Sequence, residues 1–283
     1  MKLINAICET PVGEGELAIC WLGQAGFCLK DAAGRMLMVD PYLTNCGQRM
    51  RGFKRLSACL IDPAEVVPQY YIATHIHFDH FDYDAIPVVA HNSPHTLFLG
   101  PGSCIKEFKK AGVQEECCCR LDRGSIFNDR AVTIQAIWAD HGTMAPDAIG
   151  VLLEMGGHRL YFSGDTAFHE ELFQSVARFR PEVAFLSVNG QFGNMNAAEG
   201  ARAAMLCGAK YTVPCHIWTF IEHQGNLYDF CRDVKKAKNC IPCCFAQGEI
   251  QILNKEGNLI EREEERKVYE SYPLYTAGSH RVL

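Results

Sequence analysis

The residues best suited to chemistry lie in one short segment, Thr74-His75-Ile76-His77-Phe78-Asp79-His80, which holds three imidazoles and a carboxylate. The apolar run before it, residues 70–73, is typical of a buried strand. Side chains two positions apart on extended backbone share a face, so we expect His75 and His77 to reach one point and Asp79 and His80 a second. Imidazole and carboxylate suit Zn and Mn, and two ions about 3.5–4 Å apart can share one water. A polar surface loop is the alternative, but this spacing after a strand favours a metal site.

Further ligand-type residues follow other predicted strands. His141 comes after the alternating run 131–138, Asp165 after the hairpin 151–162, and His216 after the short run 210–214. In the hairpin, Gly156-Gly157 forms a two-residue turn. Asp40 closes the apolar run 36–39, where it is either a turn former before Pro41 or a support for the metal loop through hydrogen bonds.

These segments resemble the motifs of the metallo-β-lactamase superfamily, in the same order along the chain. The resemblance implies a first metal ion held by His75, His77 and His141, and a second held by Asp79, His80 and His216, with Asp165 bridging both. The implied fold is α/β, an αββα four-layer sandwich of two mixed sheets with outer helices. We expect residues 1–283 to form one hydrolase domain, with residues 261–283 as a charged, helical segment and tail.

Local matches narrow the resemblance to the branch that includes L-ascorbate-6-phosphate lactonase. They are Trp21-Leu22-Gly23 in the predicted hairpin 16–30, Gln48-Arg49-Met50, and His216-Ile217-Trp218. The long loop 44–62 contains four cations, Arg49, Arg51, Lys54 and Arg55. They are candidates for holding an anionic substrate such as a sugar phosphate, because the planar guanidinium of arginine suits phosphate. A solvated surface is the alternative for this loop. Asn189, at the expected rim, is a candidate for binding substrate hydroxyls or is ordinary loop polarity.

The function we predict is metal-dependent hydrolysis, the opening of a lactone of a phosphorylated sugar acid. A water shared by two ions would be acidified and attack the carbonyl, while one ion stabilises the developing oxyanion. Asp79 and His216 are the predicted catalytic residues, with Asp79 carrying a proton to the leaving oxygen. Zn and Mn are the expected metals, with Fe as a further choice. A phosphodiesterase or nuclease on the same two-metal site, or a non-haem iron oxidoreductase of this fold, is the alternative.

Composition limits the class of partner. The net charge of −6 argues against non-specific nucleic-acid binding, which needs a basic surface. We find no 18-residue uncharged apolar run and no signal-peptide core, so we expect no membrane span and a cytoplasmic location. The fifteen cysteines are then expected to be reduced thiols, and the C-x-x-C at 240–243 is a weak sign of a redox pair or zinc site. Tyrosines in the tail leave a homo-oligomer open.

Three local expectations concern helix ends and one turn. Ser103 is the expected N-cap and Gly112 the expected stop of a helix at 104–111. Asn196 and Glu199 are spaced for a capping box at the start of a helix at 197–207. His158, at the tip of the predicted hairpin, is expected to face solvent.

Overall fold

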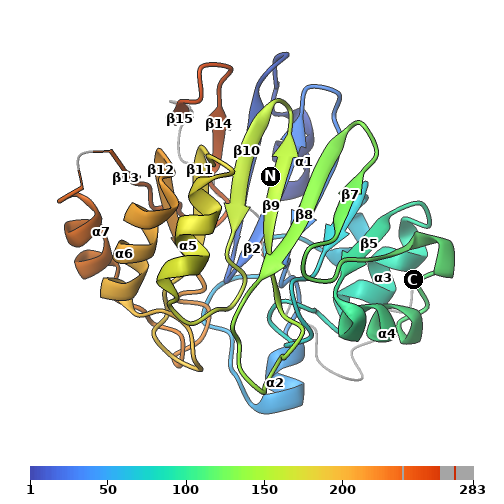
Figure 1. Cartoon of the computed structure of the whole chain (residues 1–283). Coiled ribbons are helices and arrows are strands. Elements are labelled where there is room, and N and C mark those ends of the chain that lie inside the picture. The colour runs from blue at the N-terminus through green and yellow to red at the C-terminus, as the bar shows by residue number, and fades with distance from the viewer. Residues whose placement is uncertain (238, 262–270, 272–283) are drawn as a thin grey trace.

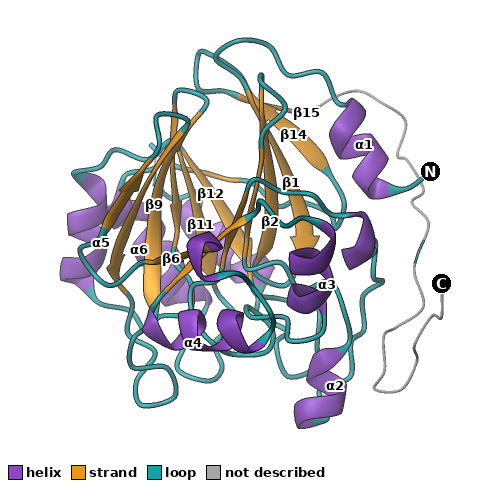
Figure 2. Cartoon of the chain, turned by 90° about the vertical axis from the view of Figure 1, so that its right-hand side faces the viewer, coloured by secondary structure: helices purple, strands orange, loops and turns teal. Residues whose placement is uncertain are grey.

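The computed structural model describes residues 1–237, 239–261 and 271. Two mixed β-sheets face each other, and helices cover the outer face of each (Figure 1). Viewed from the side, the sheets stand between α5 and α6 on one flank and α1 and α3 on the other (Figure 2). The predicted αββα sandwich is confirmed. The charged segment expected after residue 261 lies outside the described residues.

The first sheet has the order β15-β14-β1-β2-β3-β4-β5-β6. Strands β15 to β3 pair antiparallel, and β3 to β6 pair parallel. Their bounds are β1 Leu17–Gly23, β2 Gly26–Asp31, β3 Met36–Val39, β4 Tyr70–Ile72, β5 Leu97–Gly100, β6 Cys118–Arg120, β14 Ile250–Leu253 and β15 Leu259–Glu261.

The second sheet has the order β13-β12-β11-β10-β9-β8-β7. Strands β7 to β10 pair antiparallel and β10 to β13 pair parallel. Their bounds are β7 Ile126–Asn128, β8 Val132–Trp138, β9 Ile149–Met155, β10 His158–Phe162, β11 Val183–Ser187, β12 Tyr211–Cys215 and β13 Ile241–Pro242.

Helices connect the parallel strands and cover the sheets. The first sheet carries α1 Leu3–Glu9, α3 Ala85–Asn92, α4 Gly102–Lys110 and the 3-10 turns Pro63–Glu65 and Glu115–Cys117, and the second carries α5 Glu170–Ala177, α6 Ala197–Cys207 and α7 Leu227–Val234. The remaining helix, α2 Cys46–Arg51, projects below the sheets in Figure 1.

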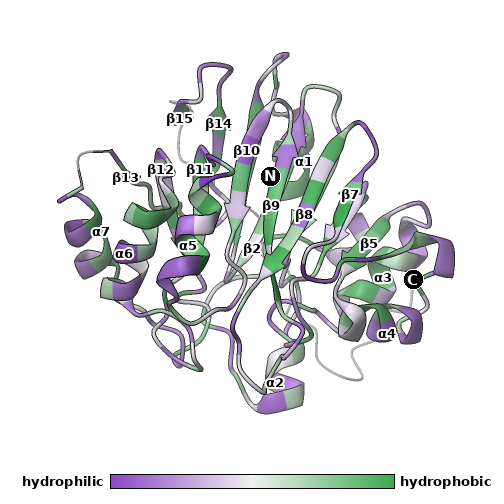
Figure 3. Ribbon diagram, in the orientation of Figure 1, coloured by the Kyte–Doolittle hydropathy of each residue, from purple (hydrophilic) through white to green (hydrophobic). Residues whose placement is uncertain are grey.

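Strand β1 shows how the layers are specified. Leu17, Ile19 and Trp21 belong to the core cluster between the sheets, while Cys20 and Leu22 pack in the cluster beneath α1, α3 and α4. Successive side chains of a strand point to opposite faces, so a strand buried on both faces reads as a continuous apolar run. Figure 3 shows the same pattern as hydrophobic strands with helices that are hydrophilic on their outer sides.

Several local expectations are confirmed. The capping box at Asn196 and Glu199 is present at the start of α6, and Gly208 ends that helix at φ 67°. Gly156 and Gly157, with φ of 62° and 88°, form the turn between β9 and β10.

Three expectations were wrong. The loop 44–62 contains the short helix α2. Helix α4 begins at Gly102, so Ser103 lies in its first turn and donates a hydrogen bond to Asp147. His158 is 3% exposed, because its ring contacts the Glu182 carboxylate and the carbonyl oxygen of Gly15.

The cysteines are free thiols. Cys240 and Cys243 form no disulfide: the Sγ of Cys240 lies 3.0 Å from Thr212 Oγ1, and that of Cys243 lies 3.4 Å from Gln251 Oε1. The C-x-x-C segment therefore holds two free thiols in this structure. Among the described residues, none of the helices has the length and apolar character needed to cross a membrane.

Candidate metal centre

Four strands deliver the ligand-type residues to one edge of the sandwich. Residues 75–80 follow β4, His141 follows β8, Asp165 follows β10, and His216 follows β12. The carboxyl ends of β8 and β10 point to the lower part of Figure 1, toward α2. The seven predicted ligands gather there in two groups, His75-His77-His141-Asp165 and Asp79-His80-His216. Within each group the ligand atoms lie within 4.8 Å of one another.

The first group is built on three imidazoles. The Nδ1 atom of His77 lies 3.0 Å from Nε2 of His75 and 3.1 Å from Nε2 of His141. Asp165 completes the group, with Oδ2 3.6 Å from His141 Nε2 and 4.0 Å from His75 Nε2.

The second group shares the same aspartate. His216 Nε2 lies 3.0 Å from His80 Nε2 and 3.1 Å from Asp79 Oδ2. Asp165 places Oδ1 3.2 Å from His80 Nε2 and Oδ2 3.2 Å from His216 Nε2. One carboxylate therefore faces both groups, as a bridging ligand would.

The donor set fits divalent metal ions. Facing unprotonated ring nitrogens 3.0 Å apart bring two lone pairs together, which is unfavourable unless a proton or a cation lies between them. Asp165 Oδ1 is also buried without a hydrogen-bond partner. Imidazole nitrogen with carboxylate oxygen is the ligand chemistry of Zn, Mn and Fe. A cation at each group would balance these charges and lone pairs.

Electrostatics separate the histidines into two kinds. Burial lowers the pKa values of His75, His77 and His141, so these rings are neutral and ready to bind metal. Burial alone would also lower the pKa of His216, but Asp165 and Asp79 outweigh it and raise that pKa to about 9. In the metal-free protein a proton therefore occupies part of the second group.

The two aspartates are ionised in this setting. Burial opposes their charge, but His80 and His216 overcome it and hold the pKa values of Asp79 and Asp165 well below the usual range. Both carboxylates are thus available as ligands at neutral pH.

Asp40 lies behind the second group and fixes the metal loop. Its carboxylate accepts hydrogen bonds of 2.7 Å from Thr74 N and Thr74 Oγ1, and it lies 2.7 Å from His80 Nδ1. A carboxylate at Nδ1 holds the proton there and leaves Nε2 free for a metal. Support of the metal loop by Asp40 stays a prediction, and these hydrogen bonds are the geometry that it requires.

Gly164 explains how Asp165 reaches the centre. It has φ +57°, and a Cβ there would lie 2.7 Å from the carbonyl oxygen of Ile149 and 3.2 Å from the side chain of Thr74. Only glycine fits this turn without moving backbone, so the turn can direct Asp165 between the two groups.

Sequence reasoning missed Gln24 and His223. The Nε2 atom of Gln24 lies 2.7 Å from Asp79 Oδ2 and 2.7 Å from His223 Nδ1. The His223 ring stacks on that of His216, with 4.6 Å between centroids. The available signals were a polar residue between two turn glycines, and a histidine seven positions after His216.

The predicted anion-binding residues of loop 44–62 differ in their burial and contacts. Arg55 is 5% exposed, and its guanidinium donates to four backbone carbonyls, those of Tyr42, Thr44, Ser57 and Ala58. It braces the loop, so the expectation that it binds substrate was wrong. Arg49, Arg51 and Lys54 are all exposed, and Arg49 pairs with Asp84.

Asn189, the other predicted substrate-binding residue, follows β11. It is buried, and neither its amide nitrogen nor its amide oxygen has a hydrogen-bond partner. The residue does not lie on an exposed rim, and its polar atoms need a partner such as water or a ligand.

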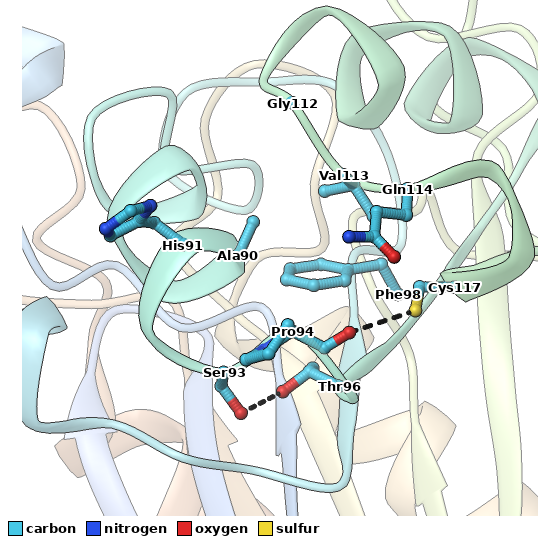
Figure 4. Close-up of a pocket in the computed structure, with 10 residues that line it drawn as sticks. All are labelled: Ala90, His91, Ser93, Pro94, Thr96, Phe98, Gly112, Val113, Gln114 and Cys117. Atoms are coloured by element: carbon cyan, nitrogen blue, oxygen red, sulfur yellow. Dashed lines mark hydrogen bonds between the residues drawn. The ribbon is translucent and has the colours of Figure 1, made fainter.

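A hollow elsewhere on the molecule differs from this centre. It measures about 180 Å³ and lies between α3, β5 and the segment after α4 (Figure 4). Its polar contacts are internal, Ser93 with Thr96 and Cys117 with Pro94. None of the grouped ligand-type residues lines it, so the metal centre is the candidate functional site.

Comparisons with known proteins agree with this architecture. Residues 35–217 match the model of the Beta-lactamase superfamily domain, and the chain belongs to that family. A UPF0173 metal-dependent hydrolase of Myxococcus xanthus is 27% identical over 237 residues, covering 80% of this chain and 79% of the relative. A probable L-ascorbate-6-phosphate lactonase of Shigella boydii is 27% identical over 260 residues, covering 75% of this chain and 73% of the relative.

The fold also matches solved structures. Igni18, a metallo hydrolase of Ignicoccus hospitalis, superposes with a TM-score of 0.66 at 20% identity, covering 84% of this chain and 98% of that one. Together these relatives confirm the predicted class, a metal-dependent hydrolase of the metallo-β-lactamase fold.

Proposed function

We propose that this chain hydrolyses the ester bond of a small lactone at a two-metal centre. The observation that carries the proposal is the position of Asp165, whose carboxylate lies 3.2 Å from His80 and His216 and 3.6 Å from His141. Its place between two groups of ligands supports two metal ions rather than one. The ligands would be His75, His77, His141 and Asp165 for one ion and Asp79, His80, His216 and Asp165 for the other.

Bound there, zinc, manganese or iron would supply a Lewis acid that acidifies water and polarises a substrate carbonyl. The protein's own contribution is to fix the ligands and move the proton. Asp79 lies 3.1 Å from His216 and accepts a hydrogen bond from Gln24, which holds one carboxylate oxygen in place. We propose that Asp79 passes the proton from water to the leaving oxygen, with His216 positioning it.

A lactone of a phosphorylated sugar acid is the specific substrate that the sequence resemblance predicts. The Shigella boydii relative, named a probable L-ascorbate-6-phosphate lactonase, supports it at 27% identity. With Arg55 committed to the fold and Arg49 paired with Asp84, the other two exposed cations of the loop, Arg51 and Lys54, would hold an anionic group. A cytoplasmic location and self-association remain predictions from the sequence.

The test is hydrolysis by protein reconstituted separately with Zn, Mn and Fe. Substrates are L-ascorbate 6-phosphate, γ-valerolactone and bis-p-nitrophenyl phosphate, with His77→Ala as the ligand variant and His91→Ala as a matched exposed control. Lactone opening that requires metal and His77 but not His91 is the expected result. Cleavage of the phosphodiester alone would overturn the lactonase proposal in favour of a phosphodiesterase.

A further inference from the structure

Aromatic rings from separate loops meet beside the second group of ligands. We define the aromatic lip as Phe53, Phe78 and Phe192. Phe53 follows α2, Phe78 lies in the metal loop, and Phe192 follows β11. Phe53 has its ring centroid 5.3 Å from that of Phe78 and 5.9 Å from that of Phe192. Tyr42 and Phe220, both fully buried, pack behind these rings.

The lip is continuous with the metal centre through one histidine. The His223 ring lies 5.8 Å from Phe53 and 5.2 Å from Phe192, centroid to centroid. The same ring stacks on that of the ligand His216, with 4.6 Å between centroids. A molecule held at the second group of ligands would therefore lie near the His223 ring, and Phe53 and Phe192 lie directly beyond that ring.

Packing within the fold does not account for the outer part of the lip. Phe192 is 46% exposed, and Phe53 and Phe78 are only partly buried. Phe192 also has φ 55°, a conformation that bulky residues rarely adopt. Glycine would adopt this backbone conformation at a lower cost than phenylalanine. Its ring contacts with Phe53 and His223 place it one ring away from the ligand His216.

We infer that Phe53 and Phe192 select substrates by packing against an apolar group, an aryl ring or a branched alkyl chain, on the carbon that bears the leaving oxygen of the scissile ester bond. The inference rests on the proposed hydrolysis of lactones and names the kind of lactone. Phenyl rings cannot hydrogen-bond the hydroxyls of a sugar acid, so those hydroxyls would lose water without a replacement. The favoured lactone therefore carries an apolar substituent where a sugar acid has hydroxyls, and this inference replaces the phosphorylated sugar acid that the sequence resemblance predicts with a more apolar lactone.

Lactones with the same reactive ring isolate this effect. γ-Phenyl-γ-butyrolactone and γ-valerolactone differ only in a phenyl or methyl substituent, and L-ascorbate 6-phosphate is the polar comparison. A single methylene in an apolar pocket changes kcat/KM about 10–200-fold. We expect Phe192→Ala to lower kcat/KM for the phenyl lactone about tenfold or more and to change that for the methyl lactone less than about threefold.

Matched variants control for general damage. Tyr228→Ala removes a ring on α7 that is 77% exposed and lies over Arg232. We expect this variant to keep the wild-type kcat/KM for both lactones. Phe53→Leu keeps an apolar side chain in the more buried position and should give an intermediate loss. Equal losses on both lactones in Phe192→Ala, or a wild-type preference for L-ascorbate 6-phosphate that Phe192→Ala leaves unchanged, would overturn the inference.

Binding measured by calorimetry separates this inference from the proposed function. Zinc-loaded wild type is titrated with 4-phenylbutyrate and with butyrate, and the titrations are repeated on Phe192→Ala. Tighter binding of 4-phenylbutyrate that is lost in the variant supports the lip even when no lactone is hydrolysed, in which case only the proposed reaction fails. Equal affinities of wild type for the two acids would refute the inference.

Discussion

Replacing Asp40 with asparagine tests how the fold prepares the second group of ligands. The carboxylate accepts from Thr74 N and Thr74 Oγ1 and holds the proton on His80 Nδ1, each at 2.7 Å. In Asp40→Asn, the amide oxygen can still accept from Thr74 N. The amide NH₂ would then face His80 Nδ1, which favours the tautomer with its proton on Nε2. That is the atom needed for metal.

The expected loss of metal affinity follows from the removal of the carboxylate that contacts the ligand His80. Removing such a residue weakens metal binding by roughly 10–100-fold, or about 1.4–2.7 kcal/mol. Because the change acts directly on His80 and is linked to His75 only through Thr74 Oγ1, the first group should keep its affinity. We therefore expect Asp40→Asn to bind its first equivalent of zinc like wild type and its second equivalent about 10–100-fold more weakly.

The assay is competitive titration of zinc against a chromogenic chelator, with bound metal counted by mass spectrometry. Asp31→Asn is the matched control, because Asp31 is also buried and accepts three hydrogen bonds, from Ala33 N, Arg35 N and Arg35 Nε. It should lose similar stability with unchanged metal affinity. If Asp40→Asn bound both equivalents like wild type, the tautomer argument would be refuted.

Three further predictions address pH, the Asp165 turn and Arg55. Asp165 and Asp79 raise the pKa of His216 to about 9 against the effect of burial, so a proton must leave that ring when metal binds. Metal affinity at the second group should therefore rise by up to about tenfold per pH unit from pH 6 toward pH 9. Chelator titrations that give the same affinity at each pH would contradict this. Gly164→Ala should lower the free energy of unfolding by about 2–3 kcal/mol, against about 1 kcal/mol for Gly157→Ala, where nothing lies within 4 Å of the new Cβ; equal denaturant midpoints would refute the clash. Arg55→Lys should cost about 1–3 kcal/mol of stability because a lysine cannot serve four carbonyls, whereas Arg51→Lys should cost almost nothing, as urea unfolding would measure.

The strands and the helix ends were predictable because their signals are local. The apolar runs before His75, Asp165 and His216 became β4, β10 and β12, and the Asn196 capping box formed as expected. Charge and polarity near the site were less informative. Arg55 reads as an exposed cation in sequence, but its guanidinium closes the loop around Tyr42 and Thr44, a role set by tertiary contacts. His158 is buried for the same kind of reason, a pairing with Glu182 that lies 24 residues away.

Gln24 and His223 show why the edge of the centre could not be found from local pattern. Gln24 comes from the first hairpin and His223 from the loop after β12, 199 residues apart, and they meet only because the two sheets stack. Gln24, Asp40 and His216 each have positive φ, at 53°, 45° and 63°. Such backbone conformations are unfavourable for these residue types. They cluster around Asp79 and His80, where the strain is the cost of directing side chains toward the centre. The geometry of the centre is thus set by strained loop positions whose side chains the stacked sheets bring within contact of the ligands.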